Sequence, residues 1–120
     1  MLTVNINGKD YGFVFNSNTS ELYYQTFGED LFEITMKLKD DAQLILKRNR
    51  LQKLAYIANQ QASKTVRELA GHMNITTYLM WSEQFNGNEF LTGPAAAQII
   101  DSWRGSFETK SEEKNQTSPQ

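Results

Sequence analysis

Hydrophobic and polar residues alternate along the first sixteen positions of the chain. This period of two places the apolar side chains on one face of an extended strand. Asn7-Gly8 interrupts the alternation and is a strong hairpin signal, because both residues tolerate a positive φ. The pattern predicts a β-hairpin whose apolar face needs a cover, since an isolated hairpin is only marginally stable in water. The apolar positions are Leu2, Val4, Ile6, Tyr11, Phe13 and Phe15.

The hydrophobic period changes from 2 to 3.6 after residue 16, which predicts helices for the rest of the chain. Turn and N-cap residues at 16–20 precede a short helix that Gly28 ends. A second helix carries Leu31, Ile34 and Leu38, and the longest runs from about 42 to 63. Two short helices are expected at 65–73 and 75–85. A last one begins with Thr92 as cap and Pro94 in the first turn, and ends at Gly105.

These elements predict an α+β fold that is mostly α: an N-terminal hairpin, a bundle of about five helices and a disordered C-terminal tail. A chain of 120 residues is expected to form one domain. We place the hairpin and helices in residues 1–107. Residues 108–120 are polar and are predicted to be a disordered tail.

Composition argues against a catalytic or metal-binding protein. The chain has no cysteine, which excludes disulfide scaffolds, Cys-based metal sites and cysteine nucleophiles. Its single histidine, His72, has no partner at a metal-ligand spacing. We therefore expect no enzyme, no cofactor and no metal. No apolar run is long enough to span a membrane and the N-terminus lacks a basic leader, so we expect a cytoplasmic location.

Charge is distributed in three blocks although the net charge is only −2. Residues 1–36 carry one Lys and five acids, 37–67 carry eight bases and two acids, and 68–120 carry three bases and seven acids, giving −4, +6 and −4. The blocks can satisfy one another within the fold, which we favour, or between copies of the chain. The positive block contains a basic cluster on the first half of the longest predicted helix, at Lys47, Arg48, Arg50 and Lys53.

Residues 65–79 are similar to a helix-turn-helix, with a turn at Met73-Asn74-Ile75. The second helix of such a motif presents basic or amide side chains to phosphates and base edges. Residues 76–85 contain no Lys or Arg and include Glu83. A DNA-reading role is therefore disfavoured, because phosphate contacts by Lys and Arg dominate DNA affinity. The basic cluster keeps a small DNA-binding regulator as an alternative.

The layout as a whole resembles the tail assembly chaperones of long-tailed (siphovirus-type) bacteriophages that infect Gram-positive hosts. The likeness is carried by the opening Ile6-Asn7-Gly8-Lys9-Asp10-Tyr11 and by residues 51–58 as the family's long central helix. It is also carried by the tryptophan-containing Trp81-Ser82-Glu83-Gln84-Phe85 and by residues 95–103 before a polar tail. The resemblance spans nearly the whole chain.

This resemblance implies a non-enzymatic protein of the host cytoplasm that is absent from the mature virion. Such chaperones bind the long, apolar, helical tape-measure protein and keep it soluble while tail-tube subunits polymerise around it. Helices with apolar stripes are suited to cover another chain's apolar faces. Self-association is also expected. A tail-completion or connector protein of the virion is a further alternative.

We select six residues as a candidate partner or self-association surface. They are the basic cluster, one aromatic residue of the last predicted helix and one just after it, because aromatic residues anchor interfaces: Lys47, Arg48, Arg50, Lys53, Trp103 and Phe107. Relatives often make a longer product by ribosomal frameshifting, which would recruit the tail-tube protein. The last base of the Glu113 codon, followed by the codons for Lys114 and Asn115, can form the slippery sequence A-AAA-AAY, so Lys114 and Asn115 are the candidate frameshift position.

Overall fold

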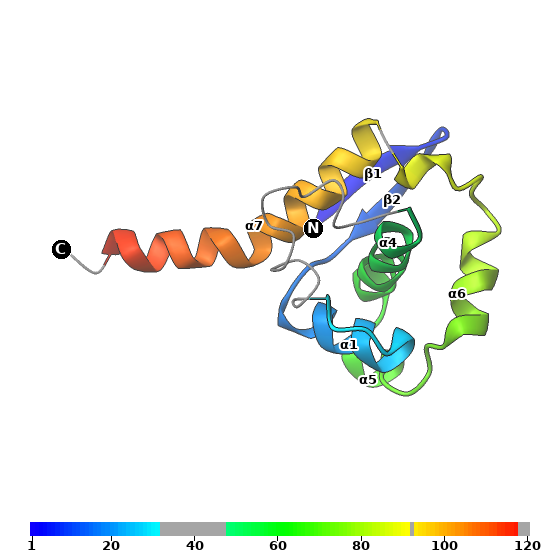
Figure 1. Cartoon of the computed structure of the whole chain (residues 1–120), viewed down its shortest axis with the longest axis horizontal. Coiled ribbons are helices and arrows are strands. Elements are labelled where there is room, and N and C mark those ends of the chain that lie inside the picture. The colour runs from blue at the N-terminus through cyan, green and yellow to red at the C-terminus, as the bar shows by residue number, and fades with distance from the viewer. Residues whose placement is uncertain (32–47, 92, 118–120) are drawn as a thin grey trace.

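The structure is a computed structural model that describes residues 1–31, 48–91 and 93–117, with Arg48 and residues 107–117 as backbone alone. Two strands, five α-helices and one 3-10 helix lie in these ranges (Figure 1). The predicted fold class, α+β and mostly α with an N-terminal hairpin, is confirmed. The predicted helix around Ile34 and Leu38 and the first residues of the long helix, including Lys47, lie outside the described residues.

The hairpin consists of β1 (Leu2–Ile6) and β2 (Lys9–Phe13), paired antiparallel with Val4 opposite Tyr11. Asn7 and Gly8 both have positive φ, at 55° and 88°, as a tight two-residue hairpin turn requires. The strand ends two residues earlier than the sequence indicates. The chain leaves the sheet after Phe13 because the Val14 backbone N–H donates to the carbonyl oxygen of Ala58 at 3.0 Å.

Helix α1 (Ser17–Phe27) begins and ends as the sequence predicts. The Asn16 side chain caps its N-terminus in a capping box with Thr19, and Gly28 ends it in the left-handed conformation. Thr19 is fully buried, but its hydroxyl is bonded to the Gln61 side chain at 2.7 Å. This bond ties the start of α1 to the end of the next described helix.

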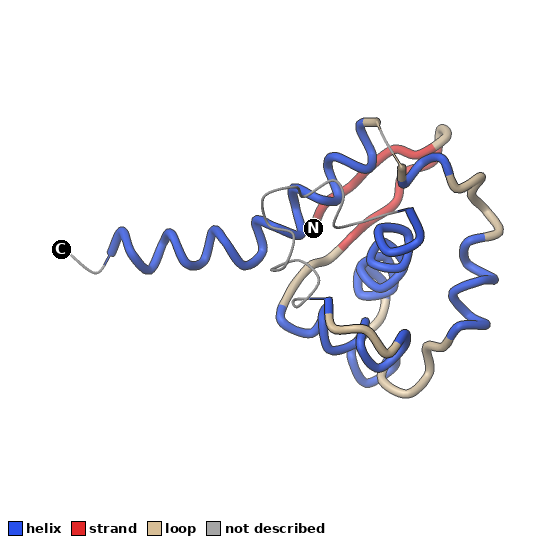
Figure 2. The backbone as a smooth tube through the Cα atoms, viewed as in Figure 1, coloured by secondary structure: helices blue, strands red, loops and turns tan. Residues whose placement is uncertain are grey.

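Helix α4 (Arg48–Ser63) lies at the centre of the molecule, between the hairpin and α1 on one side and α6 on the other (Figures 1 and 2). The sequence assigned it a single apolar stripe, yet Tyr56 and Ile57 are buried together with Leu54, Ala55 and Ala58. Because elements pack on several sides of α4, it buries most of its circumference over residues 51–58. It is therefore the core helix of the fold.

After α4 the chain forms α5 (Val66–Leu69), α6 (Ile75–Ser82) and the 3-10 helix η1 (Asn88–Phe90). The final helix, α7 (Pro94–Thr117), packs its first turns against β1 and η1 and then projects away from the body (Figure 1). The prediction that this helix ends at Gly105 is wrong, because its backbone stays helical to Thr117. The disordered character of residues 108–120 stays a prediction.

Candidate functional site: the outer face of helix α6

Helix α6 is fixed in place by hydrogen bonds at its start and its inner face. Asn74 caps the N-terminus in a capping box with Thr77. The Thr77 hydroxyl also lies 2.8 Å from the hydroxyl of Tyr56 on α4. Near the other end, the indole Nε1 of Trp81 donates to the Asn59 side chain at 2.9 Å. The helix is thus held to α4 at both ends.

An aromatic layer fills the space between α6 and the rest of the body. The Tyr78 ring packs edge-on against Tyr56 and Phe27, with centroids 5.6 and 5.2 Å apart. The Trp81 ring lies 5.5 Å from Tyr56 and 4.8 Å from Phe85. Edge and tilted contacts at these distances are favourable beyond simple burial. They make the inner face of α6 a rigid part of the core.

The opposite side of α6 is also apolar, and it is exposed. We define the outer face of α6 as five residues that fall within an arc of about 140° on a helix with 3.6 residues per turn. They are Ile75, Thr76, Leu79, Met80 and Glu83. The exposed fractions of Ile75, Leu79 and Met80 are 48%, 54% and 65%. A helix that is apolar all round is normally buried, so this exposed face is unusual.

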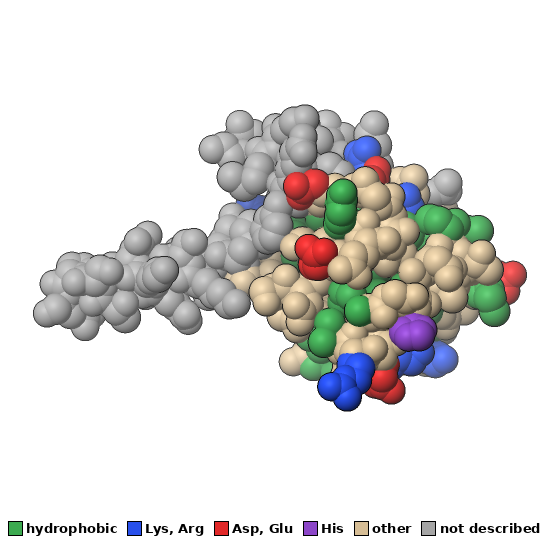
Figure 3. All heavy atoms as spheres, turned by 90° about the horizontal axis from the view of Figure 1, so that it is seen from below, with side chains coloured by type: hydrophobic (Ala, Val, Ile, Leu, Met, Phe, Trp, Pro, Cys, Tyr) green, Lys and Arg blue, Asp and Glu red, His purple; other side chains and the backbone are tan. Residues whose placement is uncertain are grey.

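Few charged residues lie on this face, and hydrophobic side chains are exposed at the surface near it. Residues 75–82 contain no charged side chain, and Glu83 at the C-cap is the one acid of the outer face. In the space-filling view, hydrophobic side chains reach the surface at the edge that α6 forms, on the right (Figure 3). Val66 of the neighbouring α5 is also about half exposed. Exposed apolar patches of this kind mark interaction sites.

The basic cluster selected from sequence is partly engaged inside the fold. The Arg50 guanidinium Nε lies 3.7 Å from the Glu29 carboxylate, which also accepts the Tyr23 hydroxyl at 3.0 Å. The Lys53 ammonium lies 5.0 Å from the centre of the Phe27 ring, a cation–π contact. The side chains of Lys47 and Arg48 lie outside the described residues. Arg50 and Lys53 therefore join α4 to α1 and its following loop.

The Arg50–Glu29 pair joins the positive block of the chain to the first negative block. At this contact the charge blocks satisfy one another within the fold, as the favoured interpretation predicts. Burial, together with the neighbouring Glu29 carboxylate, raises the pKa of Tyr23 far above its usual value. Its hydroxyl therefore remains a hydrogen-bond donor at any ordinary pH.

The two aromatic residues selected as contact residues have different outcomes. Trp103 is only 1% exposed and packs against Phe15, with ring centroids 6.4 Å apart. Trp103 is a core residue, so its selection for a partner surface is wrong. It lies on the same face of α7 as the buried Ala96 and Ile99, and this face packs against the body. The Phe107 side chain lies outside the described residues.

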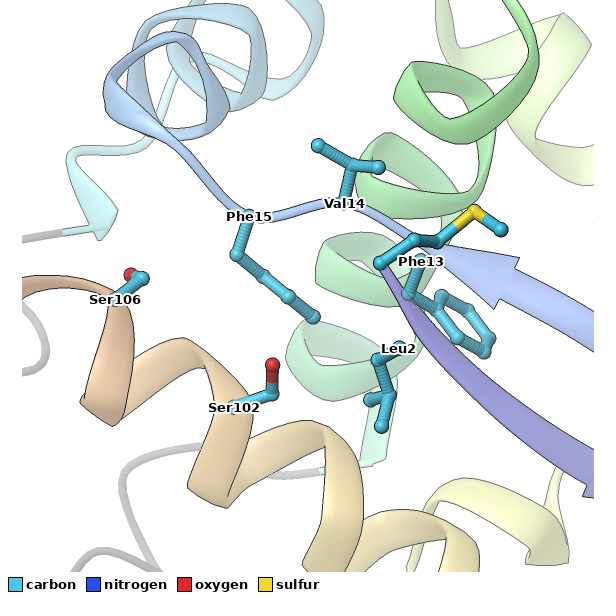
Figure 4. Close-up of a pocket in the computed structure, with 7 residues that line it drawn as sticks. Leu2, Phe13, Val14, Phe15, Ser102 and Ser106 are labelled. Carbon is cyan, nitrogen blue, oxygen red and sulfur yellow. The ribbon is translucent and has the colours of Figure 1, made fainter.

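A pocket of about 240 Å³ opens between the start of β1, the chain after β2 and helix α7 (Figure 4). No lining residue has a charged side chain; the residues are Met1, Leu2, Phe13, Val14, Phe15, Ser102 and Ser106. The Ser106 hydroxyl donates to the backbone carbonyl of Trp103 at 2.6 Å. This lining offers no arrangement of groups for acid–base chemistry.

Metal-binding clusters and membrane-spanning helices are both absent from the described residues. Within the described ranges, no three acidic or histidine side chains are grouped so that they could hold a metal ion. None of the described helices combines the length and apolar character needed to cross a membrane. His72 is exposed, and its backbone N–H bonds to Leu69 just after α5.

Sequence reasoning missed the outer face of α6 because it looked for large aromatic and basic residues. The aromatic residues of this region pack inward, whereas medium-sized aliphatic residues face solvent. A signal was available: residues 75–82 have no charged residue, so any side of that helix that faces solvent exposes apolar side chains.

Comparisons of the chain with protein-family models, curated proteins and solved structures find no match.

Proposed function

We propose that this protein is a bacteriophage tail assembly chaperone that binds the apolar, helical tape-measure protein and acts without enzymatic chemistry. One observation carries the proposal: α6 is apolar on both sides, and the side turned outward exposes Ile75, Leu79 and Met80. A protein that keeps an apolar chain soluble needs a surface of this chemistry. The layout of the sequence supplies the phage context of the proposal.

The same observation weighs against a DNA-binding regulator. In a helix-turn-helix arrangement α6 would be the reading helix, yet its outer face carries three apolar residues and one acid. Of the basic cluster, Arg50 and Lys53 have partners within the fold. Both features leave fewer basic groups for the phosphate contacts that such a regulator requires.

Co-expression tests the proposal. The gene neighbourhood should contain a very long reading frame with apolar helical periodicity, and its product should be soluble with this chain and aggregate without it. Purified virions should lack the chain, which separates a chaperone from a tail-completion protein. An aggregated long product despite abundant chaperone, or the chain present in virions at stoichiometric amounts, would refute the proposal.

Salt separates a chaperone from a DNA-binding protein in solution. Contacts made by the apolar side chains of the outer face should withstand 0.5 M NaCl and strengthen in sulfate. DNA retention through phosphate contacts falls steeply over the same NaCl range. Retention of duplex DNA that disappears with salt, without any salt-resistant binding of the long product, would favour the regulator.

A further inference from the structure

We infer that the outer face of α6 is a docking site for one α-helix of a partner, a helix with an apolar stripe, and that each site binds it weakly. This inference rests on the proposed function and deepens it by naming the contact surface and the shape of its occupant. Three observations carry it: the spacing of the exposed side chains, the rigidity of α6 and the small size of the face.

The spacing of the exposed residues is that of a helix-packing surface. Ile75 and Leu79 are four positions apart and form one ridge, and Thr76 and Met80 form a second ridge beside it. Ridges of this type accept the ridges of another helix between them. Met80, the most exposed of the three apolar residues, has a flexible side chain that can adapt to different partner residues.

The face is preformed, so a partner helix needs no rearrangement of this chain. The bonds from Thr77 to Tyr56 and from Trp81 to Asn59 hold α6 to the core helix, and Tyr78 locks it through ring contacts. A rigid apolar surface avoids the ordering cost that a flexible segment would incur on binding. The same anchoring keeps the outer residues from turning inward.

The size of the face selects the kind of partner. A helix of eight residues is about 12 Å long, which matches two turns of a partner helix. Stable interfaces between two proteins involve roughly 20–30 residues and about 800 Å² on each side. Five residues on one short helix fall far below that size, so the face alone is too small to hold two copies of the chain in a stable dimer.

A long partner with repeated apolar helix turns can nevertheless be covered along its length. Several copies of this chain can bind one rod, one at each apolar stretch, so that the rod is shielded from water while every single contact stays weak. Each copy can still leave on its own, because its individual contact is small. This behaviour is what displacement by a growing tube requires.

Fluorescence anisotropy with designed peptides tests the inference on the full chain. The probes are a labelled 28-residue helix with Leu along one face, a tandem repeat of it, and a scrambled helix of the same composition. We expect weak binding of the single helix, one copy of the chain bound to each repeat of the tandem at a similar affinity per site, and little binding of the scrambled peptide. Failure of the unaltered chain to prefer the striped helix over the scrambled one overturns the inference.

Paired variants locate the site. Replacing Leu79 and Met80 together by Ser should weaken striped-helix binding by about tenfold or more, because both side chains are more than half exposed and available for burial. Tyr24→Ser on α1, at a side chain 55% exposed, is the matched control and should bind as the unaltered chain does. Circular dichroism should show both variants folded. Unchanged binding by the double variant, or an equal loss in the control, contradicts the site.

The two proposals fail separately. If the chain keeps the long reading-frame product soluble and the double variant does so equally well, the chaperone role stands and the α6 site is wrong. If the chain binds striped helices through α6 but leaves that product insoluble, the docking site stands and the phage role is wrong. A second copy on the face would appear as a concentration-dependent dimer that the double variant abolishes, which would also overturn the partner-helix inference.

Discussion

Asn59 is the side chain whose removal should most directly uncouple α6 from the body. Its Nδ2 donates to the backbone carbonyl of Gly12 in β2 at 2.8 Å, and its Oδ1 accepts from Trp81 at 2.9 Å. One half-buried amide on the central helix thus joins the hairpin on one side to α6 on the other. Asn59→Ala breaks both bonds at once.

The expected loss of stability follows from two lost hydrogen bonds, whose partners, the Gly12 carbonyl and the Trp81 indole, remain in the fold. Each intramolecular hydrogen bond contributes about 1 kcal/mol net, and leaving a buried partner unsatisfied costs about 1–3 kcal/mol. We expect Asn59→Ala to lower the free energy of unfolding by about 2–4 kcal/mol. For a domain of this size the melting temperature should fall by about 4 °C for each kcal/mol.

Urea titration followed by circular dichroism and tryptophan fluorescence measures this change. Gln60→Ala is the matched control, since it shortens the neighbouring amide side chain, for which the described residues provide no hydrogen-bond partner. The control should lie within about 0.5 kcal/mol of the unaltered chain. An Asn59→Ala variant as stable as the control would refute the bridging role.

Asn59→Asp separates the two bonds. A carboxylate still accepts from Trp81 but cannot donate to the Gly12 carbonyl, and its charge faces that oxygen. Burial and this contact should raise the folded-state pKa of the new carboxyl. A raised pKa contributes stability at low pH that is lost as pH rises, so the deficit of this variant should shrink on acidification. A deficit that is constant with pH would contradict the expected contact.

Three further predictions concern other contacts. Partial burial favours a higher pKa for Glu89, but hydrogen bonds from the backbones of Asn86 and Gly87 and from the Asn7 side chain lower it on balance. The free energy of unfolding should therefore fall as the pH drops below about 4.5. Glu89→Gln should reduce that fall in acid titrations followed by circular dichroism. Gly28→Ala should lower the free energy of unfolding, measured by urea titration, by about 1–2 kcal/mol. The cause is the φ of 74°, which disfavours alanine, since the space around the new Cβ is open. Trp103→Ala should cost about 3–5 kcal/mol as a core truncation; a variant of normal stability that loses only partner binding would contradict that role.

Local signals predicted the elements of this fold well. Asn7-Gly8 and the alternation before it define the hairpin, while Asn16 and Gly28 mark the two ends of α1. Each of these is a short-range effect of backbone conformation or of capping, so the residues themselves carry the information.

Long-range features were not available from the sequence. The burial of Tyr56 and Ile57 depends on several elements meeting around α4, which a one-stripe helix does not anticipate. Trp103 was selected for an interface because an aromatic residue serves a core and a contact surface equally well. The absence of charge from residues 75–82 could have predicted that α6 exposes apolar side chains. Which side faces solvent is decided by the contacts of Trp81 with Asn59 and of Thr77 with Tyr56.

The packing of α7 against β1 also sets the order in which the chain can fold. The first strand and Trp103 are separated by almost the whole chain, and the protein is synthesised from the N-terminus at roughly 5–20 residues per second. Synthesis of the residues between the hairpin and Trp103 therefore takes roughly 5–20 s, and during this time α7 cannot yet cover β1. During that interval α4, which packs against β2, can already shield the apolar side chains of that strand. Folding speed in the cell should consequently be limited by synthesis of α7, and truncations before Trp103 should leave the hairpin open to aggregation.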